Sequence, residues 1–237
     1  MDAPTAIAAV ALLSEVFDQV KEFFPAYRQF KIRSEYDDNV FKEQYIKSMS
    51  ENVHNISEEN FQYPNPSIIY PAMSESLFYV REEEIREMFA KLIASSFDKS
   101  NNEFLHPGFI GIIKQLSPFD ARLLMSIHDS STIKGFVAIS NNVEYKLIET
   151  NLLEGPESVN QISLSLDNLI RLGLINIDKN LEYTVYDKNG QMISLHSSSE
   201  LAKTSKFYNL LHEQYKLYTA NTYITVLGQN FLKVCVD

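Results

Sequence analysis

The serine and lysine of Ser96-Phe97-Asp98-Lys99 have the S-x-x-K spacing of enzymes that pair a serine nucleophile with a lysine. The companion S-D-N and K-T-G elements of that enzyme class are absent from the sequence. The densest acidic cluster consists of Glu82, Glu83, Glu84 and Glu87. Successive helical residues point about 100° apart, so these carboxylates do not converge on a metal ion. We interpret the serine match as chance and the carboxylates as a solvated helix start.

The histidines share no ligand spacing such as H-x-x-x-H with one another or with the cysteine. They are His54, His106, His128, His196 and His212. No G-x-x-x-x-G-K-[ST], G-x-G-x-x-G or G-x-S-x-G motif occurs, and seven glycines leave little scope for a loop that cradles phosphate. We expect no metal, no cofactor and no catalytic residue. A cryptic nuclease or hydrolase stays a less favoured alternative, because enzymes without metals or motifs exist.

Basic and aromatic residues alternate near the N-terminus of an otherwise acidic chain. The candidate interaction residues there are Lys21, Tyr27, Arg28, Phe30, Lys31 and Arg33. Such alternation suits a membrane interface or a nucleic-acid backbone. The simpler interpretation is a helix end that packs its aromatic rings inward and extends its cations into water. A membrane surface contacted through residues 5–33 is therefore an alternative, not the leading hypothesis.

Composition limits the classes of function. The formal net charge of −10 over 237 residues disfavours nonspecific binding to nucleic acid or anionic lipid. The apolar fraction of 45%, with 15 Phe and 13 Tyr, indicates a folded protein. A single cysteine, Cys235, excludes an intrachain disulfide and is expected to be a small buried apolar residue. With no signal peptide and no run of about 18 apolar residues, we expect a cytoplasmic protein.

Apolar spacing predicts a helical N-terminal half. Helices are expected over Thr5–Phe24 and Glu35–Ile56, followed by a proline-containing loop over Phe61–Pro71 and a short helix over Pro71–Tyr79. Ile85 to Phe97 then have the spacing of one buried helix face. We expect Glu82/Arg86 and Glu87/Lys91 to form exposed i,i+4 pairs on the opposite face.

Two sharp helix starts follow. His106-Pro107 places a proline at an early helical position, and a contact at the helix entry explains the histidine more simply than catalysis does. Ser117-Pro118-Phe119-Asp120 has an N-cap serine, a proline at the first helical position and an acidic residue at the third. We expect Asp120 to be a capping group.

The C-terminal half changes character. We expect a short helix over Asn142–Thr150 and a helix over Ser158–Leu172 that ends at Gly173. Strands over Leu181–Tyr186 and Met192–His196 flank Asn189-Gly190, a strong hairpin signal. This order resembles a winged helix. DNA is disfavoured as a partner, because Arg171 is the only cation of the helix that would read the groove.

A heptad-like seam predicts a helical insertion over about 198–219. Its apolar positions are Leu201, Thr204, Tyr208, Leu211, Tyr215 and Tyr218. Packing onto its own domain is the default, and a homo-oligomer formed through Tyr208 and Tyr215 is the alternative.

Four segments together resemble the abortive-infection alpha family, bacterial proteins linked to defence against phage. They read EEEIREMFAKLIASSFD, HPGFIGIIKQLSPFDARLL, LDNLIRLGLI and TVLGQNFLKVCV. The resemblance covers about Ser67 to the C-terminus and is looser before that. It implies a role in defence and supplies no catalytic residue.

The sequence thus predicts a mainly α (α+β) protein with an N-terminal α-helical domain over 1–116. A winged-helix-like domain with a small antiparallel β-sheet is expected over 117–237. The leading hypothesis is phage defence through binding of a protein partner or sensing of a phage component. A membrane-directed effector is the alternative.

Overall fold

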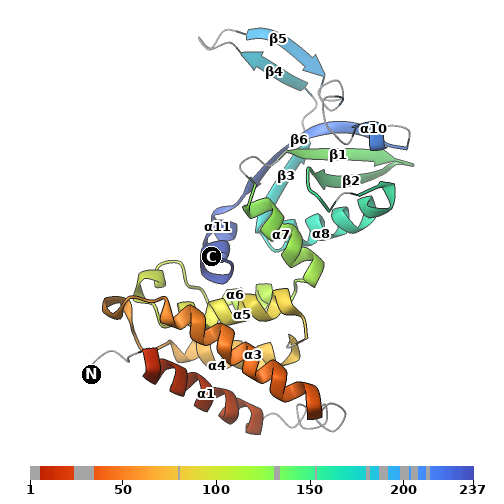
Figure 1. The fold of residues 1–237 in the computed structure, drawn as a ribbon. Coiled ribbons are helices and arrows are strands. Elements are labelled where there is room, and N and C mark those ends of the chain that lie inside the picture. Colours follow the sequence, from red (N-terminus) through yellow and green to blue (C-terminus); the bar gives the residue numbers. More distant parts are fainter. Residues whose placement is uncertain are drawn as a thin grey trace. The chain divides into compact units, whose positions relative to one another are not determined.

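The computed structural model describes the following residues: 6–23, 35–79, 81–130, 134–152, 154–179, 182–186, 192–197, 203, 208–211 and 214–237. Contacts group the chain into two compact units. The N-terminal unit comprises Met1–Ala121 with Asn230–Asp237, and the C-terminal unit comprises Arg122–Gln229. Helices predominate and the larger sheet is antiparallel, so the α+β class is confirmed (Figure 1). The predicted boundary at 116/117 stays a prediction.

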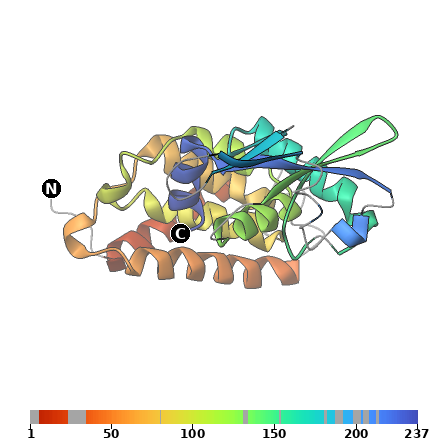
Figure 2. The ribbon, with the colours of Figure 1, turned by 90° about the horizontal axis from the view of Figure 1, so that it is seen from above.

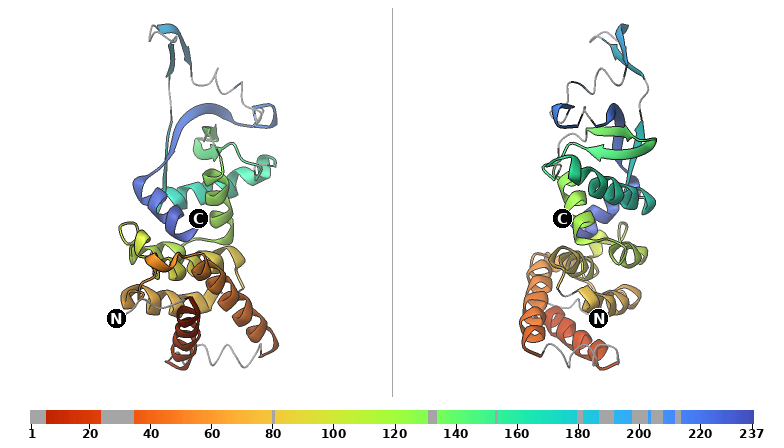
Figure 3. Two further views of the ribbon diagram at one scale, coloured as in Figure 1. Left: turned by 60° about the vertical axis from the view of Figure 1, so that its left-hand side comes forward. Right: turned by 90° about the vertical axis from the view of Figure 1, so that its right-hand side faces the viewer.

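Helices build the N-terminal unit. They are α1 (Ala6–Phe23), α3 (Glu35–His54), α4 (Pro66–Ser76), α5 (Glu83–Ser95) and α6 (Gly108–Ile113), with 3-10 turns η1 (Glu58–Asn60), η2 (Leu77–Tyr79) and η3 (Lys99–Asn101). Helix α5 contacts α3, α4 and α6, while α1 packs on α3 and α4 (Figures 2 and 3). The unit therefore has one core with α5 as its most enclosed helix.

The predicted apolar face of α5 is confirmed, because Ile85, Phe89 and Leu92 have no exposed surface. The predicted exposed i,i+4 pairs are wrong. Arg86 is only 8% exposed and its guanidinium lies 3.4 Å from Glu87, while Lys91 donates to the carbonyl of Val236. These polar side chains are engaged because α5 is covered on more than its apolar face.

The predicted loop over Phe61–Pro71 is wrong at its C-terminal end, because α4 begins at Pro66. The side chain of Asn65 accepts a hydrogen bond from the amide of Ser67 at 2.9 Å, which caps the helix. Pro66 occupies the first turn, where a missing N–H costs nothing. Pro71 lies inside α4, and burial of Ile68, Ile69, Ala72 and Met73 holds the helix despite it.

The two helix starts around α6 and α7 (Pro118–His128) are fixed locally. His106 Nδ1 accepts from the amide of Gly108 at 3.0 Å. Asp120 Oδ2 accepts from the amide of Ser117 at 2.8 Å, and Ser117 Oγ accepts from the amide of Asp120 at 3.1 Å. This reciprocal pair is a capping box.

Ser117→Ala is expected to lower the free energy of unfolding by about 0.5–2 kcal/mol, because it removes the cap acceptor of α7. Urea unfolding followed by circular dichroism measures the loss. Ser57→Ala is the matched control, since Ser57 precedes η1 without a side-chain cap bond. Equal losses for the two variants would contradict the capping role.

A four-stranded antiparallel sheet in the order β2-β1-β6-β3 dominates the C-terminal unit. Its strands are β1 (Gly135–Ser140), β2 (Val143–Ile148), β3 (Ile175–Lys179) and β6 (Lys216–Ile224). Helix α8 (Val159–Arg171), which follows the 3-10 turn η4 (Pro156–Ser158), packs on β2 and β3. The short helix α10 (Tyr208–Leu211) precedes β6, and α11 (Val226–Cys235) ends the chain. The predicted hairpin is confirmed as β4 (Glu182–Tyr186) and β5 (Met192–Ser197), a separate two-stranded sheet.

Two predictions for this half are wrong. Asn142–Thr150 is not a helix but contains strand β2, which follows β1 through a two-residue turn. Asn141 and Asn142 have positive φ angles of 50° and 63°, as a type I′ hairpin turn requires. The predicted insertion helix ends too late, because Tyr218 lies in β6. Most of residues 198–207 lie outside the described residues.

Hydrogen bonds join the residues that follow α8 to the residue that precedes α11, although the two segments are far apart in the sequence. Gly173 has a φ of +75° and ends the helix, with the amide of Leu174 donating to the carbonyl of Leu169 at 3.0 Å. The hydroxyl of Thr225 donates to the carbonyl of Gly173. The backbone amide of Thr225 donates to the carbonyl of Leu174 at 3.0 Å. The start of α11 is therefore tied to the end of α8. Arg171 donates to Asn168 Oδ1 at 2.7 Å along the same helix.

Candidate functional site

The structure leaves most of the basic aromatic segment undescribed. Lys21 belongs to α1, whereas Tyr27, Arg28, Phe30, Lys31 and Arg33 lie outside the described residues. The apolar face of α1 is buried at Ala9, Leu13 and Phe17, and the ring of Phe17 meets that of Tyr45 on α3 at 6.5 Å. This face is occupied within the N-terminal unit. Among the described helices, none combines the length and apolar character needed to cross a membrane.

The candidate tyrosines of the insertion belong to the C-terminal unit. Tyr208 begins α10 and is half-buried. The ring of Tyr215 meets that of Tyr145 on β2 edge-on, with centroids 5.6 Å apart. Partial burial raises the pKa of Tyr215 above its ordinary value. Tyr215 thus packs against its own sheet, as the default interpretation of the seam expects.

The serine and lysine of the S-x-x-K match are not arranged as a nucleophile and its base. Ser96 is fully buried and its hydroxyl donates to the carbonyl of Ile93 at 2.6 Å, while Lys99 is exposed. Within the described residues, no group of three or more His, Cys, Asp or Glu side chains is placed to hold a metal ion.

Cys235 is buried, and burial raises the pKa of its thiol well above its ordinary value.

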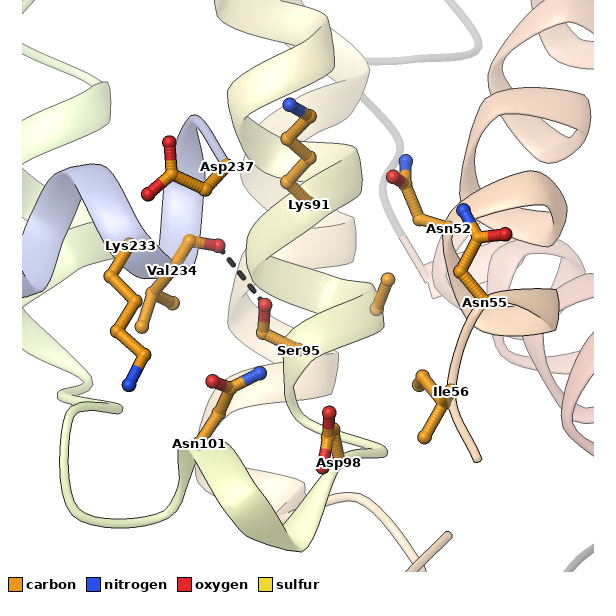
Figure 4. Close-up of a pocket in the computed structure, with 11 residues that line it drawn as sticks. Asn52, Asn55, Ile56, Lys91, Ser95, Asp98, Asn101, Lys233, Val234 and Asp237 are labelled. Atoms are coloured by element: carbon orange, nitrogen blue, oxygen red, sulfur yellow. Dashed lines mark hydrogen bonds between the residues drawn. The ribbon is translucent and has the colours of Figure 1, made fainter. Parts of the chain in front are cut away.

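A polar hollow of about 180 Å³ opens in the N-terminal unit (Figure 4). We call it the amide-lysine hollow. The C-terminal end of α3, helix α5, turn η3 and the end of α11 line it. Its lining residues are Asn52, Asn55, Ile56, Lys91, Ala94, Ser95, Asp98, Asn101, Lys233, Val234 and Asp237.

Some of these groups hold the hollow together. Lys91 donates to the carbonyl of Val236, and Ser95 Oγ donates to the carbonyl of Val234 at 3.1 Å. Val234 lies in the last turn of α11 and Val236 directly follows the helix, where carbonyls have no partner within the helix. A lysine there also interacts favourably with the negative end of the helix dipole. Lys91 and Ser95 therefore fix the end of α11 on α5.

Other groups remain able to bind. Within the described residues, the side-chain amides of Asn55 and Asn101 make no hydrogen bond. Asp98 Oδ1 accepts from the amide of Ser100 at 2.8 Å, which leaves its carboxylate further acceptor capacity. The ammonium of Lys233 lies 3.3 Å from the centroid of the Phe104 ring. Hydrogen-bond donors, acceptors and both signs of charge are thus offered together.

A second hollow between α3 and α5 is lined by polar and charged side chains, several of which contact one another. Ser48 donates to Glu87, Lys47 lies 3.7 Å from Glu51, and Arg86 lies 3.4 Å from Glu87. These charges are largely engaged with one another. The amide-lysine hollow is therefore the better candidate site.

Sequence reasoning did not identify Asn55, Asn101 or Lys233. The sequence signal for the hollow is indirect. Lys91, Ser95 and Asp98 fall in one of the segments that resemble the family, and Lys233 falls in another. Polar positions of these two segments converge on one hollow.

Fold and site define a mainly helical α+β protein with a polar hollow in its helical unit. Residues 37–235 match the family described as Abortive infection alpha, and the chain belongs to that family. No curated protein and no solved structure matches the chain.

Proposed function

We propose that the chain acts in defence against phage by recognising a molecular sign of infection at the amide-lysine hollow. It then acts through a partner protein, without an active site of its own. The family match over residues 37–235 carries the proposal. The convergence of Asn55, Asp98, Asn101 and Lys233 supports it. The side-chain amides of Asn55 and Asn101 make no hydrogen bond within the described residues, and Asp98 keeps acceptor capacity beyond the Ser100 amide.

The C-terminal unit is proposed as a winged-helix-like scaffold for protein contact. Helix α8 followed by β3 and the β4-β5 hairpin supports this description, whereas β1 and β2 depart from it. The exposed side of α8 presents Leu164, which is 68% exposed, together with Asp167 and Arg171. This surface suits a protein better than DNA, because one arginine beside a carboxylate neutralises few phosphates.

The membrane-directed alternative has no observation of the described residues in its favour. The buried face of α1 is engaged with α3 and α4. Binding of purified protein to anionic liposomes would restore that alternative.

Plating a broad panel of phages on cells with and without the gene tests the proposal. We expect at least one phage to form about tenfold fewer plaques on cells that carry it. Equal plaque counts across the panel would contradict a role in defence. An Asp98→Asn variant that folds but does not protect would locate the function at the hollow.

A further inference from the structure

The amide-lysine hollow has balanced charge. Lys91 and Lys233 line it together with Asp98 and Asp237, and Lys91 already donates to the carbonyl of Val236. An anion such as a nucleotide would meet carboxylates as well as ammonium groups, and a cation would meet lysines. A molecule that carries one charge of each sign, and is neutral overall, finds a complementary group for both.

The lining also limits the kind of molecule. No aromatic ring is among the lining residues that the structure describes, so these residues give a nucleobase no surface on which to stack. The apolar contribution comes only from Ile56, Ala94 and Val234. Three carboxamides instead offer paired donors and acceptors. A volume of about 180 Å³ is below the roughly 300–1,000 Å³ of pockets for drug-sized ligands. These limits favour a ligand that is small and polar.

We propose that this hollow binds a small zwitterion with the size and charge pattern of a free α-amino acid. The carboxylate of the ligand pairs with Lys233, and its ammonium pairs with Asp98. Figure 4 shows Asn101 between these two side chains and Asn55 across from them. Their carboxamides would form hydrogen bonds with the part of the ligand that joins its two charged groups. This inference names the ligand class of the proposed function and rests on it for a role in defence.

Binding to the purified full chain tests the inference independently of phage. The probes are the twenty free L-amino acids. Ligand-observed NMR detects which of them bind, and titration calorimetry measures the affinity of those that do. The comparison compounds are N-acetyl amino acid amides, adenosine monophosphate and inorganic phosphate. We expect at least one free amino acid to bind, and its uncharged N-acetyl amide to bind at least about tenfold more weakly.

Charge-removing variants locate the site. Asp98→Asn keeps an oxygen for the amide of Ser100, and Lys233→Gln keeps most of the side-chain length. Each is expected to weaken binding about tenfold. Lys99→Gln and Glu103→Gln are matched controls, because both side chains are exposed and lie outside the lining. They are expected to change binding less than about twofold.

Several outcomes would overturn the inference. The first is that no amino acid binds at concentrations up to about 10 mM. The second is that the Asp98→Asn and Lys233→Gln variants bind as tightly as the wild type. The third is that adenosine monophosphate or phosphate binds instead of an amino acid. None of them alters the phage plating result, so failure of the ligand class and failure of the defence role are distinguishable.

Discussion

Gly228→Ala is expected to lower the free energy of unfolding of the C-terminal unit by about 3 kcal/mol. A Cβ at this position would lie 2.0 Å from the carbonyl oxygen of Leu174 and 2.8 Å from Cγ2 of Ile224. The first contact is with backbone, so α11 must move away from the end of α8. That movement stretches the hydrogen bonds that Thr225 makes to Gly173 and Leu174. Urea unfolding, followed by near- and far-ultraviolet circular dichroism, measures the loss.

Gly111→Ala is the matched control for this prediction. Gly111 lies in α6, and nothing lies within 4 Å of a Cβ built on it. Alanine is the better helix former by about 0.5–1 kcal/mol, so this variant is expected to be neutral or slightly stabilised. A Gly228→Ala protein as stable as the Gly111→Ala protein would show that the two segments are not in tight contact.

Phe231→Ala is expected to lower the free energy of unfolding of the N-terminal unit by about 3–5 kcal/mol. Phe231 has no exposed surface, and its ring meets that of Phe109 edge-on, with centroids 5.4 Å apart at an angle of 86°. Truncation leaves a cavity where the end of α11 packs on α6. Chemical denaturation of the wild type and the variant measures the loss, and a reduced temperature of unfolding should accompany it.

Phe78→Ala is the control, because Phe78 is 53% exposed and its truncation is expected to change stability by no more than about 0.5 kcal/mol. A double-mutant cycle of Phe109 and Phe231 should return a coupling of about 0.5–1.5 kcal/mol. A loss below about 1 kcal/mol for Phe231→Ala, or no coupling, would contradict the packing of residues 230–237 in this unit.

Features encoded over short distances were predictable from the sequence. The apolar spacing of α5 and the start of α7 at Pro118 depend on neighbours within one or two turns. Strand β2 was misassigned because the turn before it was not recognised. Asn141 and Asn142 tolerate positive φ better than other residues with side chains, and such a pair between two β-rich runs is the signal that would have identified the hairpin.

The start of α4 was missed for a related reason. Three prolines in Phe61–Pro71 favour a break, whereas Asn65 caps a helix that Pro66 begins. A proline next to a capping residue begins a helix as readily as it ends one.

The candidate site could not be predicted in the same way. Asn55, Asp98 and Lys233 are separated by long stretches of chain, and only the packing of α3, η3 and the last turns of α11 on α5 brings them together. No local pattern distinguishes Asn55 or Asn101 from a solvent-exposed asparagine. The buried Arg86 shows the same limit, because its i,i+4 spacing indicated an exposed pair and only tertiary packing covers it.

The number of phage progeny released per infected cell tests the central claim most directly. Cells would carry wild-type protein, the Asp98→Asn and Lys233→Gln variants, or the Lys99→Gln control, at equal amounts of folded protein. We predict that the wild type and the control reduce progeny about tenfold for a sensitive phage and that the two hollow variants restore it. Equal protection by all four proteins would contradict the claim that the amide-lysine hollow recognises infection.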